Sequence, residues 1–189
     1  MKYDVKTLTT ERFTLRPIRA EDTAALYPTF RDEAQMRYWS CGPFESETKL
    51  DSWLRDPTWD GHCWIAEETG GDGTAIARVI ASPDMDGVME TGYLVAMDRQ
   101  GEGIARECMG ALLDHLFKPE AEGGYGLRRV WADTDPENAP SNGLLVSLGF
   151  TREGRLRQQW ETHIGVRDSL IWGLLKDEWS GPVSPVPRR

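Results

Sequence analysis

A glycine-rich segment between a predicted strand and a predicted helix carries the strongest chemical signal in this sequence. From Met97 to Arg106 it reads Met-Asp-Arg-Gln-Gly-Glu-Gly-Ile-Ala-Arg. Gly101 and Gly103 allow a tight turn and a close approach of a ligand to the backbone. The first N–H groups of a helix have no intrahelical partner and lie at the positive end of the helix dipole. The segment therefore predicts an anion site, to which Arg99 and Arg106 add contacts with a phosphate.

The alternative is a glycine-rich turn that only starts a helix. The segment lacks the Gly-Lys-Ser/Thr of a nucleotide phosphate loop. It also lies too late in the chain, after an antiparallel meander, for a dinucleotide fingerprint. We expect the Glu102 carboxylate to point to solvent or to pair with Arg106 one helical turn further on.

The chain has the size and composition of one folded domain. Its 189 residues are 39% hydrophobic and 28% charged, which is typical of a globular protein. Eight Trp, five Phe and five Tyr provide apolar area for a core, and no run reaches the ~18 apolar residues that a membrane span requires. We expect one domain over residues 1–180 and a loose tail at 181–189, which holds three prolines and two arginines.

Charge and cysteine content narrow the functional classes. With 22 basic and 31 acidic residues the formal net charge is −9, which repels phosphate backbones and tolerates a cationic substrate. Nucleic-acid binding is therefore not expected. The segment Met1–Val5 has no apolar signal region. Cys41, Cys63 and Cys108 are odd in number and lack metal-site spacing, which predicts reduced thiols in a cytoplasmic protein with no metal.

Hydrophobic periodicity and turn signals predict the elements that must position the glycine loop. Strands are expected at 11–19, 61–68, 74–81, 88–97, 127–134, 149–157 and 166–175. Helices are expected from Asp22, the predicted cap, to about Phe30, after a cap at Ser46, at 101–117 and at 139–148. The third helix carries an apolar stripe at Ile104, Cys108, Leu112, Leu113 and Leu116. This order predicts a mixed α/β sheet of about seven mostly antiparallel strands, with helices on both faces.

Two motifs, separated by a strand and in the expected order, resemble a known enzyme family. Residues 100–105, Gln-Gly-Glu-Gly-Ile-Ala, resemble Gln/Arg-x-x-Gly-x-Gly/Ala, the acyl-CoA pyrophosphate loop of the GCN5-related N-acetyltransferase (GNAT) superfamily. Residues 138–141, Asn-Ala-Pro-Ser, followed by Leu-Gly-Phe at 148–150, resemble its second motif. Over about residues 8–179 the chain is similar to the RimJ/RimL-type acetyltransferases, whose Glu-Ile-Gly-Tyr strand resembles residues 90–93. The resemblance implies a GNAT fold.

The resemblance also implies acetyl-CoA as a cosubstrate and assigns residues to it. The pantetheine arm is expected along the backbone of Leu94, Val95 and Ala96, where an N–H near Leu94 polarises the thioester carbonyl. The residues expected at the pyrophosphate are Arg99, Gln100, Gly101, Gly103, Ile104 and Ala105. Asn138 is expected either to contact pantetheine or to cap the helix that follows it.

Glu90 is the candidate general base for the attacking amine, directly or through a water molecule. The alternative is an exposed strand carboxylate with no catalytic role. An α-amine, with a pKa of roughly 7.7–8.0, needs little help at neutral pH, whereas a lysine amine near ~10.4 needs more. Asp133 and Asp135 are reserve candidates, and Asp133 is expected on the strand face opposite Ala132.

Ser141 is the candidate hydrogen-bond donor to the departing sulfur, as its position implies for a RimJ/RimL-like protein. The alternative is an ordinary residue of a helical first turn or a cap. Many GNAT enzymes place a tyrosine seven residues after the motif asparagine to protonate the thiolate. That position is Leu145 here, and this departure leaves the acid role open.

The acceptor side is implied by family analogy alone. Arg37, Tyr38, Trp39 and a loop at 157–165 are expected to border it, and Trp39 and Trp160 are either lid aromatics or core residues. The leading hypothesis is transfer of an acetyl group to a primary amine, on a protein N-terminus or a small molecule, by direct attack in a ternary complex. The alternative is a noncatalytic acyl-CoA-binding regulatory module of the same fold. A homodimer is compatible with either.

Overall fold

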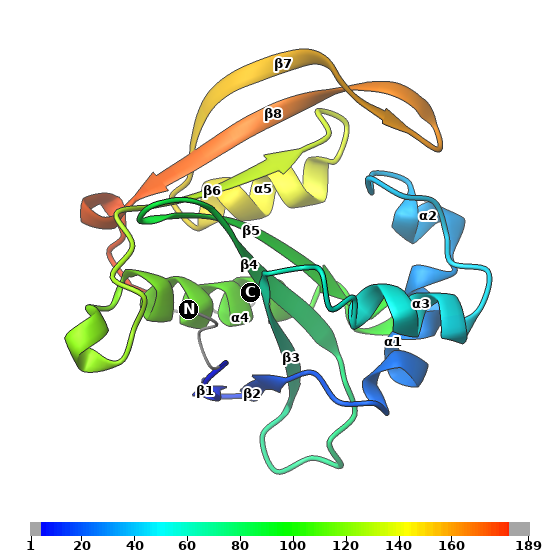
Figure 1. The fold of residues 1–189 in the computed structure, drawn as a ribbon, viewed down its shortest axis with the longest axis horizontal. Coiled ribbons are helices and arrows are strands. Elements are labelled where there is room, and N and C mark those ends of the chain that lie inside the picture. Colours follow the sequence, from blue (N-terminus) through cyan, green and yellow to red (C-terminus); the bar gives the residue numbers. More distant parts are fainter. Residues whose placement is uncertain (1–4, 182–189) are drawn as a thin grey trace, which may run out of the picture.

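The computed structural model describes residues 5–181, which form one mixed sheet with helices packed on it (Figure 1). The strands are β1 (Leu8–Thr9), β2 (Phe13–Pro17), β3 (His62–Glu68), β4 (Ala77–Met85), β5 (Val88–Val95), β6 (Arg129–Thr134), β7 (Thr151–Thr162) and β8 (Gly165–Leu175). The α-helices are α1 (Asp22–Phe30), α2 (Glu33–Met36), α3 (Glu47–Leu54), α4 (Ile104–Phe117) and α5 (Ala139–Ser147). Short 3-10 turns are η1 (Met97–Arg99), η2 (Glu120–Glu122) and η3 (Lys176–Glu178). The sheet order is β1-β2-β3-β4-β5-β6-β8-β7.

The predicted architecture is confirmed, with one strand more than expected. Every neighbouring pair in the sheet is antiparallel except β5 and β6. The seven predicted strands are β2 to β8, whereas β1 and α2 are too short to show a periodicity in the sequence. Ser46 caps α3 as predicted, because its side chain accepts from the N–H of Lys49 at 3.3 Å. Of the predicted loose tail, residues 182–189 lie outside the described part of the chain.

Asp22 is not the helix cap that the sequence predicts. It is the first residue of α1, after an N-cap at Glu21, and it belongs to a buried ion pair. Both of its carboxylate oxygens accept from Arg16 at 2.8 Å, and Arg16 also contacts Glu67. The side chains of Arg16 and Asp22 are 3% and 1% exposed. The pair therefore joins β2 to α1 in the interior, where each charge needs the other.

We expect Asp22→Ala to lower the free energy of unfolding by about 3–5 kcal/mol, because it removes a main counter-ion of the buried Arg16. The midpoint of urea unfolding measures this loss. Glu45→Ala is the control, since it removes an exposed ion pair with Lys49 and should leave the midpoint unchanged. Equal midpoints for Asp22→Ala and the wild type would show that the pair contributes nothing.

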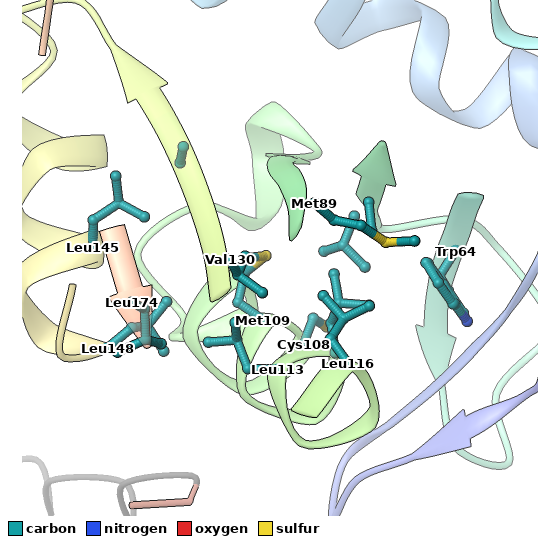
Figure 2. Packing of buried hydrophobic residues seen from close by; sticks show 14 of the residues in the cluster. Trp64, Met89, Cys108, Met109, Leu113, Leu116, Val130, Leu145, Leu148 and Leu174 are labelled. Atoms are coloured by element: carbon teal, nitrogen blue, oxygen red, sulfur yellow. The ribbon is translucent and has the colours of Figure 1, made fainter. Parts of the chain in front are cut away.

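Helices cover both faces of the sheet. The apolar stripe predicted on α4 is buried against one face together with α5, while α1, α2 and α3 pack on the other face. Figure 2 shows Met109 of α4 beside Val130 of β6, in one cluster with Met89, the register partner of Val130 on β5. In Figure 1 the hairpin of β7 and β8 arches over β6 and α5, and α1–α3 gather at the far end of the central strands. Each face thus has its own apolar core.

The sheet opens between β5 and β6, which form its parallel pair. These strands are in register only from Val88 opposite Arg129 to Glu90 opposite Trp131. On its other edge, β5 stays paired with β4 as far as Val95. In the described chain, the β5 edge beyond Glu90 therefore has no strand partner on the β6 side. Free backbone groups at such an edge can pair with an extended ligand.

The three cysteines are free thiols, as the sequence predicts. Cys63 and Cys108 are buried, and burial raises the pKa of both, that of Cys108 to about 12. They are therefore protonated near neutral pH and pack as small apolar residues. A search of residues 5–181 finds no helix with the length and hydropathy to cross a membrane.

Candidate active site

A cavity of about 410 Å³ lies where β5 and β6 separate. Glu90 and Tyr93 of β5, Asp133 of β6, and Asn138 and Ser141 at the start of α5 are among the residues that line it. Its volume is that of a small-molecule site. Successive residues of a strand point to opposite faces, and residues from both faces contribute to the lining. The cavity therefore passes through the opening in the sheet.

The N-terminus of α4 follows β5 and has no side-chain cap. Gly101 and Gly103 have φ values of +79° and +77°, and Gly103 is the N-cap residue. The N–H of Glu107 donates to the Gly103 carbonyl at 3.2 Å, so the N–H groups of residues 104–106 precede the first intrahelical bond. A Cβ added to Gly101 meets no atom within 4 Å. This turn leaves room and donors for a diphosphate.

Two carboxylates hold Arg99, a predicted phosphate contact. Arg99 donates to Glu68 at 2.6 Å and to Glu102 at 3.1 Å. Glu102 therefore pairs with Arg99, a partner that neither of the two sequence-based alternatives, solvent or Arg106, includes. The Nε of Arg106 is buried and has no hydrogen-bond partner among residues 5–181. A buried donor without a partner next to the glycine turn is consistent with an anion site there.

At the open edge of β5, the backbone groups of every second residue turn toward the opening between β5 and β6. The N–H of Ala96 donates to the Ile76 carbonyl, next to the β4 side, at 2.8 Å. Hydrogen-bonded and non-hydrogen-bonded pairs alternate along an antiparallel ladder, so we infer that the Leu94 N–H also turns toward β4. The N–H groups of Tyr93 and Val95 then turn toward the opening. The role of a backbone donor near Leu94 to a thioester oxygen stays a prediction, and these two neighbours are the N–H groups that face the opening.

Glu90 lies at the last residue pair before the sheet opens and is partly buried. The pKa of its carboxyl group is raised to about 7, first by burial and then by the charges of Asp133 and Asp84. A group with this pKa accepts and releases a proton readily at neutral pH. The sequence leaves open whether Glu90 is a general base or an exposed strand carboxylate with no catalytic role. The burial of Glu90 does not agree with the exposed carboxylate.

The reserve candidates Asp133 and Asp135 are occupied by other groups. Asp133 accepts from the indole N–H of Trp160 at 2.7 Å and from the Ser169 hydroxyl at 3.0 Å. Asp135 pairs with Arg167 at 2.7 Å. Burial acts to raise the pKa of Asp135, but its hydrogen bonds, first that from Arg167, lower it overall. A carboxylate with a lowered pKa is a weak base, so Glu90 is the better tuned of these groups.

Two hydroxyl groups meet on the α5 side of the cavity. The Ser141 Oγ lies 2.5 Å from the Tyr93 hydroxyl oxygen. Burial raises the pKa of Tyr93 to about 12, with a smaller opposing effect of the Ser141 hydrogen bond, so the phenol is protonated at neutral pH. Asn138 accepts from the Ser141 N–H at 3.3 Å and caps α5, which is one of its two expected roles. Leu145, at the position of the family tyrosine, is fully buried.

The sequence analysis does not anticipate the Tyr93 side chain as part of this site. Strand alternation places Tyr93 and Glu90 on opposite faces, and that much is visible in the sequence. The contact with Ser141 joins residues 48 positions apart. No local pattern indicates that α5 brings Ser141 to the strand.

A tuned carboxyl group and an open strand edge thus meet at one cavity, and the glycine turn of an uncapped helix follows the same strand in the chain. Residues 12–151 match a family model described as an acetyltransferase (GNAT) domain. The match spans more than half of the chain. This chain belongs to the GNAT acetyltransferase family. The enzyme class expected from the two motifs is confirmed.

Relatives and solved structures agree with the GNAT assignment. The N-acetyltransferase p20 of Bacillus licheniformis is 31% identical over 185 residues, covering 94% of this chain and 100% of that protein. RimJ of Mycobacterium smegmatis, solved with CoA-disulfide, has a TM-score of 0.75 at 23% identity, covering 94% and 91% of the two chains. Spermidine N-acetyltransferase of Vibrio cholerae, solved with CoA and spermine, has a TM-score of 0.74 at 20% identity, covering 89% and 98%. The expected GNAT fold and the likeness to RimJ are confirmed.

The cavity of this GNAT acetyltransferase is lined from two sides, by residues next to α2 and α3 and by residues of the β7–β8 hairpin. Arg37, Tyr38 and Trp39 line the cavity, as the sequence predicts. The expected loop at 157–165 is wrong, because β7 and β8 extend through most of it and only the hairpin tip lies outside the strands. Residues of this hairpin still line the cavity, and its place beside the acceptor stays a prediction.

A bulge in β7 turns one aromatic residue of the GNAT site toward the cavity. The register between β7 and β8 shifts between Leu156 and Trp160, and Gln158 has a φ of +53°. Bulges of this kind redirect side chains. Trp160 is 45% exposed and donates to Asp133, so the core interpretation is wrong for Trp160. Trp39 lines the cavity and also packs, partly buried, against the α1–α3 core.

The histidines of this GNAT chain do not lie in a metal centre. Within residues 5–181 no group of three or more His, Cys, Asp and Glu side chains is placed to hold a metal ion. His62 and His115 are buried beside the rings of Trp64 and Tyr125. Burial lowers the pKa of both histidines, so they pack as neutral rings.

Proposed function

We propose that this chain is an acetyl-CoA-dependent N-acetyltransferase that transfers the acetyl group to a primary amine by direct attack in a ternary complex. The observation that carries the proposal is the position of Glu90 and of the Tyr93–Ser141 pair at one opening of the sheet. Glu90 has the pKa of a base at neutral pH, and Ser141 has a hydroxyl group that Tyr93 contacts. An amine and a thioester placed there have both a proton acceptor and a donor to sulfur.

The residues at the opening fit a CoA ester. The N–H groups of residues 103–106 and the unpartnered Arg106 Nε are proposed to bind the pyrophosphate. Gln100 donates to the outward-facing Val95 carbonyl at 3.4 Å and is proposed to follow the phosphate end of the pantetheine arm. Arg99 is proposed to release one of its two carboxylate partners and to contact the pyrophosphate in its place. Bound acetyl-CoA supplies the electrophilic thioester carbonyl.

The protein's own groups then move one proton and stabilise two charges. The Glu90 carboxylate takes a proton from the amine, directly or through one water molecule, as the nitrogen–carbon bond forms. The N–H of Tyr93 or Val95 donates to the carbonyl oxygen while it is negative. When the carbon–sulfur bond breaks, the thiolate accepts from the Ser141 hydroxyl. In this proposal the Tyr93 hydroxyl donates to the Ser141 Oγ, so that Tyr93 is a positioning residue and the Ser141 proton is free for the sulfur.

Ser141→Ala is expected to lower kcat by about 10–100-fold, because a hydrogen bond to a charged group contributes ~1.5–3 kcal/mol. Tyr93→Phe should lower kcat by a smaller factor, and the double variant should lose little more than Ser141→Ala, since both hydroxyls act through one bond. Initial rates of CoA release measure all three. Ser147→Ala on the same helix is the control, since the Ser147 hydroxyl donates to the Leu144 carbonyl at 2.8 Å. Fully additive losses would refute the Tyr93–Ser141 relay.

The proposal is tested by cofactor binding followed by turnover. Ligand that binds only the folded state stabilises it, by about 2.7 kcal/mol at 100 times its Kd, so acetyl-CoA should raise the unfolding temperature. A free-thiol assay with a panel of primary amines should then detect CoA release. Stabilisation without release for any amine would favour the noncatalytic acyl-CoA-binding module. No stabilisation at millimolar acetyl-CoA would refute the transferase proposal.

The acceptor is proposed to be a primary amine of a protein N-terminus or of a small molecule. The spermidine acetyltransferase of Vibrio cholerae illustrates a small-molecule amine in a relative of the same fold. The free thiols support a cytoplasmic location for the enzyme. Gel filtration with light scattering would show whether the enzyme is a monomer or a homodimer.

A further inference from the structure

We propose that the amine acceptor of this enzyme is a small amino acid, and that Arg78 binds its carboxylate. This inference rests on the proposed N-acetyltransferase function and names its substrate class. Arg78 lies on β4 and lines the same cavity as Glu90. The sequence analysis does not single it out, because an arginine in a strand reads as one of many polar residues.

Arg78 is a buried charge without a protein counter-ion. Its relative exposure is 6%, no carboxylate of residues 5–181 lies within ion-pair distance of it, and its Nε has no hydrogen-bond partner there. The other buried arginine, Arg16, pairs with both Asp22 and Glu67. A buried guanidinium without a partner is costly for the folded protein. An anion of the substrate would offset that cost.

Two indole rings hold the Arg78 guanidinium at the cavity wall. Its central carbon lies 5.0 Å from the Trp53 ring centre and 5.6 Å from that of Trp59, and both rings line the cavity. Rings stacked on a guanidinium restrain its plane and leave its N–H edge free. That edge is the part that binds a carboxylate with two parallel hydrogen bonds.

The nearby polar groups do not neutralise Arg78. Asp56 also lines the cavity, but it is exposed and accepts from the N–H and hydroxyl of Thr58 at 2.8 and 2.7 Å. Burial raises the pKa of the Cys63 thiol, and Arg78 offsets this rise only in part. The thiol is therefore neutral near pH 7. Arg78 keeps its full positive charge toward the cavity.

The sheet places Arg78, proposed to bind the substrate carboxylate, and Glu90, proposed to accept the amine proton, on one face. In the β4–β5 register Arg78 is opposite Leu94, and Glu90 is opposite Ser82. Residues 78, 80 and 82 share a face, so Ile80 and its partner Gly92 form the floor between the two charged groups. A Cβ on Gly92 would lie 3.3 Å from Ile80, so the lack of a side chain at Gly92 leaves space above this floor. An acceptor on this floor meets a cation at one end and a carboxylate at the other.

The test compares matched amines with and without a carboxylate. Initial rates of CoA release are measured with L-methionine against L-methioninamide, and with 4-aminobutyrate against 4-aminobutanamide. Spermidine tests a polyamine acceptor, and a peptide with an acidic second residue tests a carboxylate carried by a protein N-terminus. We expect at least one free amino acid to exceed its amide by about 10–100-fold in kcat/KM, mainly through KM, as for a charged hydrogen-bonded pair.

Variants then assign the preference to one side chain. Arg78→Gln should remove the preference while the rates with the amides stay within a few-fold, and Arg78→Lys should restore part of it. Arg31→Gln is the matched control, since Arg31 also stacks on a ring, that of Tyr27, but does not line this cavity. If Arg78→Gln does not fold, the test uses the ratio of kcat/KM between each amino acid and its amide. This ratio is then compared between the wild type and Arg78→Lys.

Each outcome separates this inference from the proposed function. Equal rates with acids and amides, a preference for spermidine or for the acidic peptide, or a preference that survives Arg78→Gln would overturn the amino-acid acceptor and leave the transferase intact. Stabilisation by acetyl-CoA with no turnover of any carboxylate-bearing amine would overturn it as well. If acetyl-CoA does not stabilise the wild-type protein, the proposed function itself is refuted.

Discussion

Glu90→Gln is expected to lower kcat by about 10²–10⁴-fold, the usual contribution of a general base. The pH profile should change with it. In the wild type, kcat should rise with pH through an apparent pKa near 7, because burial, Asp133 and Asp84 raise the Glu90 pKa to about 7 and only the ionised form accepts a proton. In Glu90→Gln this rise should disappear. Initial rates of CoA release between pH 5 and 9 measure both effects.

Two neighbouring variants test the cause of the raised pKa. Asp133→Asn and Asp84→Asn each remove a negative charge that raises the Glu90 pKa. Each should therefore move the midpoint of the kcat profile to lower pH while the plateau at high pH is retained. An unchanged midpoint in both variants, or a pH rise that persists in Glu90→Gln, would assign the titration to another group.

Stability provides a readout of Glu90 that does not depend on activity. A carboxyl group whose folded pKa is raised from 4.5 to about 7 stabilises the folded state in its neutral form, and this contribution is lost as the pH rises through the folded pKa. At pH 8 the ionised Glu90 is partly buried, so Glu90→Gln should raise the unfolding temperature. At pH 4 the group is protonated in both states, and the difference should vanish.

Gly103→Trp is expected to abolish the stabilisation by acetyl-CoA. Gly103 is the N-cap of α4 with a φ of +77°, and a bulky side chain there would occupy the space in front of the first helical N–H groups. Thermal unfolding with and without millimolar acetyl-CoA measures the loss, which corresponds to the full binding contribution of about 2.7 kcal/mol at 100 times Kd.

A matched glycine separates loss of binding from backbone strain. A side chain at positive φ is strained wherever it is placed, so Gly103→Trp also lowers the stability of the free protein. Gly70 has a φ of +74° and no atom within 4 Å of an added Cβ, and it lies in the turn after β3. Gly70→Trp should lose similar stability and keep the full response to acetyl-CoA. A normal stabilisation of Gly103→Trp by acetyl-CoA would show that the pyrophosphate does not bind at this turn.

The sequence by itself determined the elements and the family. Strands β2 to β8 and helices α3, α4 and α5 follow from periodicity, turn residues and caps such as Ser46 and Asn138, which act within a few residues of the chain. The glycine turn at residues 101–103 has the positive φ values that its residue types favour. Such features are local, so a single sequence is enough to predict them.

Only the tertiary structure decided which charges meet. Asp22 has the residue type of a cap, but folding of β2 against α1 brings it to Arg16. Arg99 contacts Glu68, at the end of β3 and 31 positions away, as well as the nearby Glu102. These pairings depend on how separate segments approach one another, and residue spacing along a helix does not contain that information.

The chemical character of the site was decided in the same way. The pKa of Glu90 near 7 comes from burial and from Asp133, 43 positions away in the sequence, and the contact of Tyr93 with Ser141 forms only where α5 docks beside the open sheet. Among the described residues no carboxylate lies within ion-pair distance of Arg78, and its Nε has no hydrogen-bond partner. Burial and long-range charge set the energy of an ionised group, and both exist only once the chain is folded.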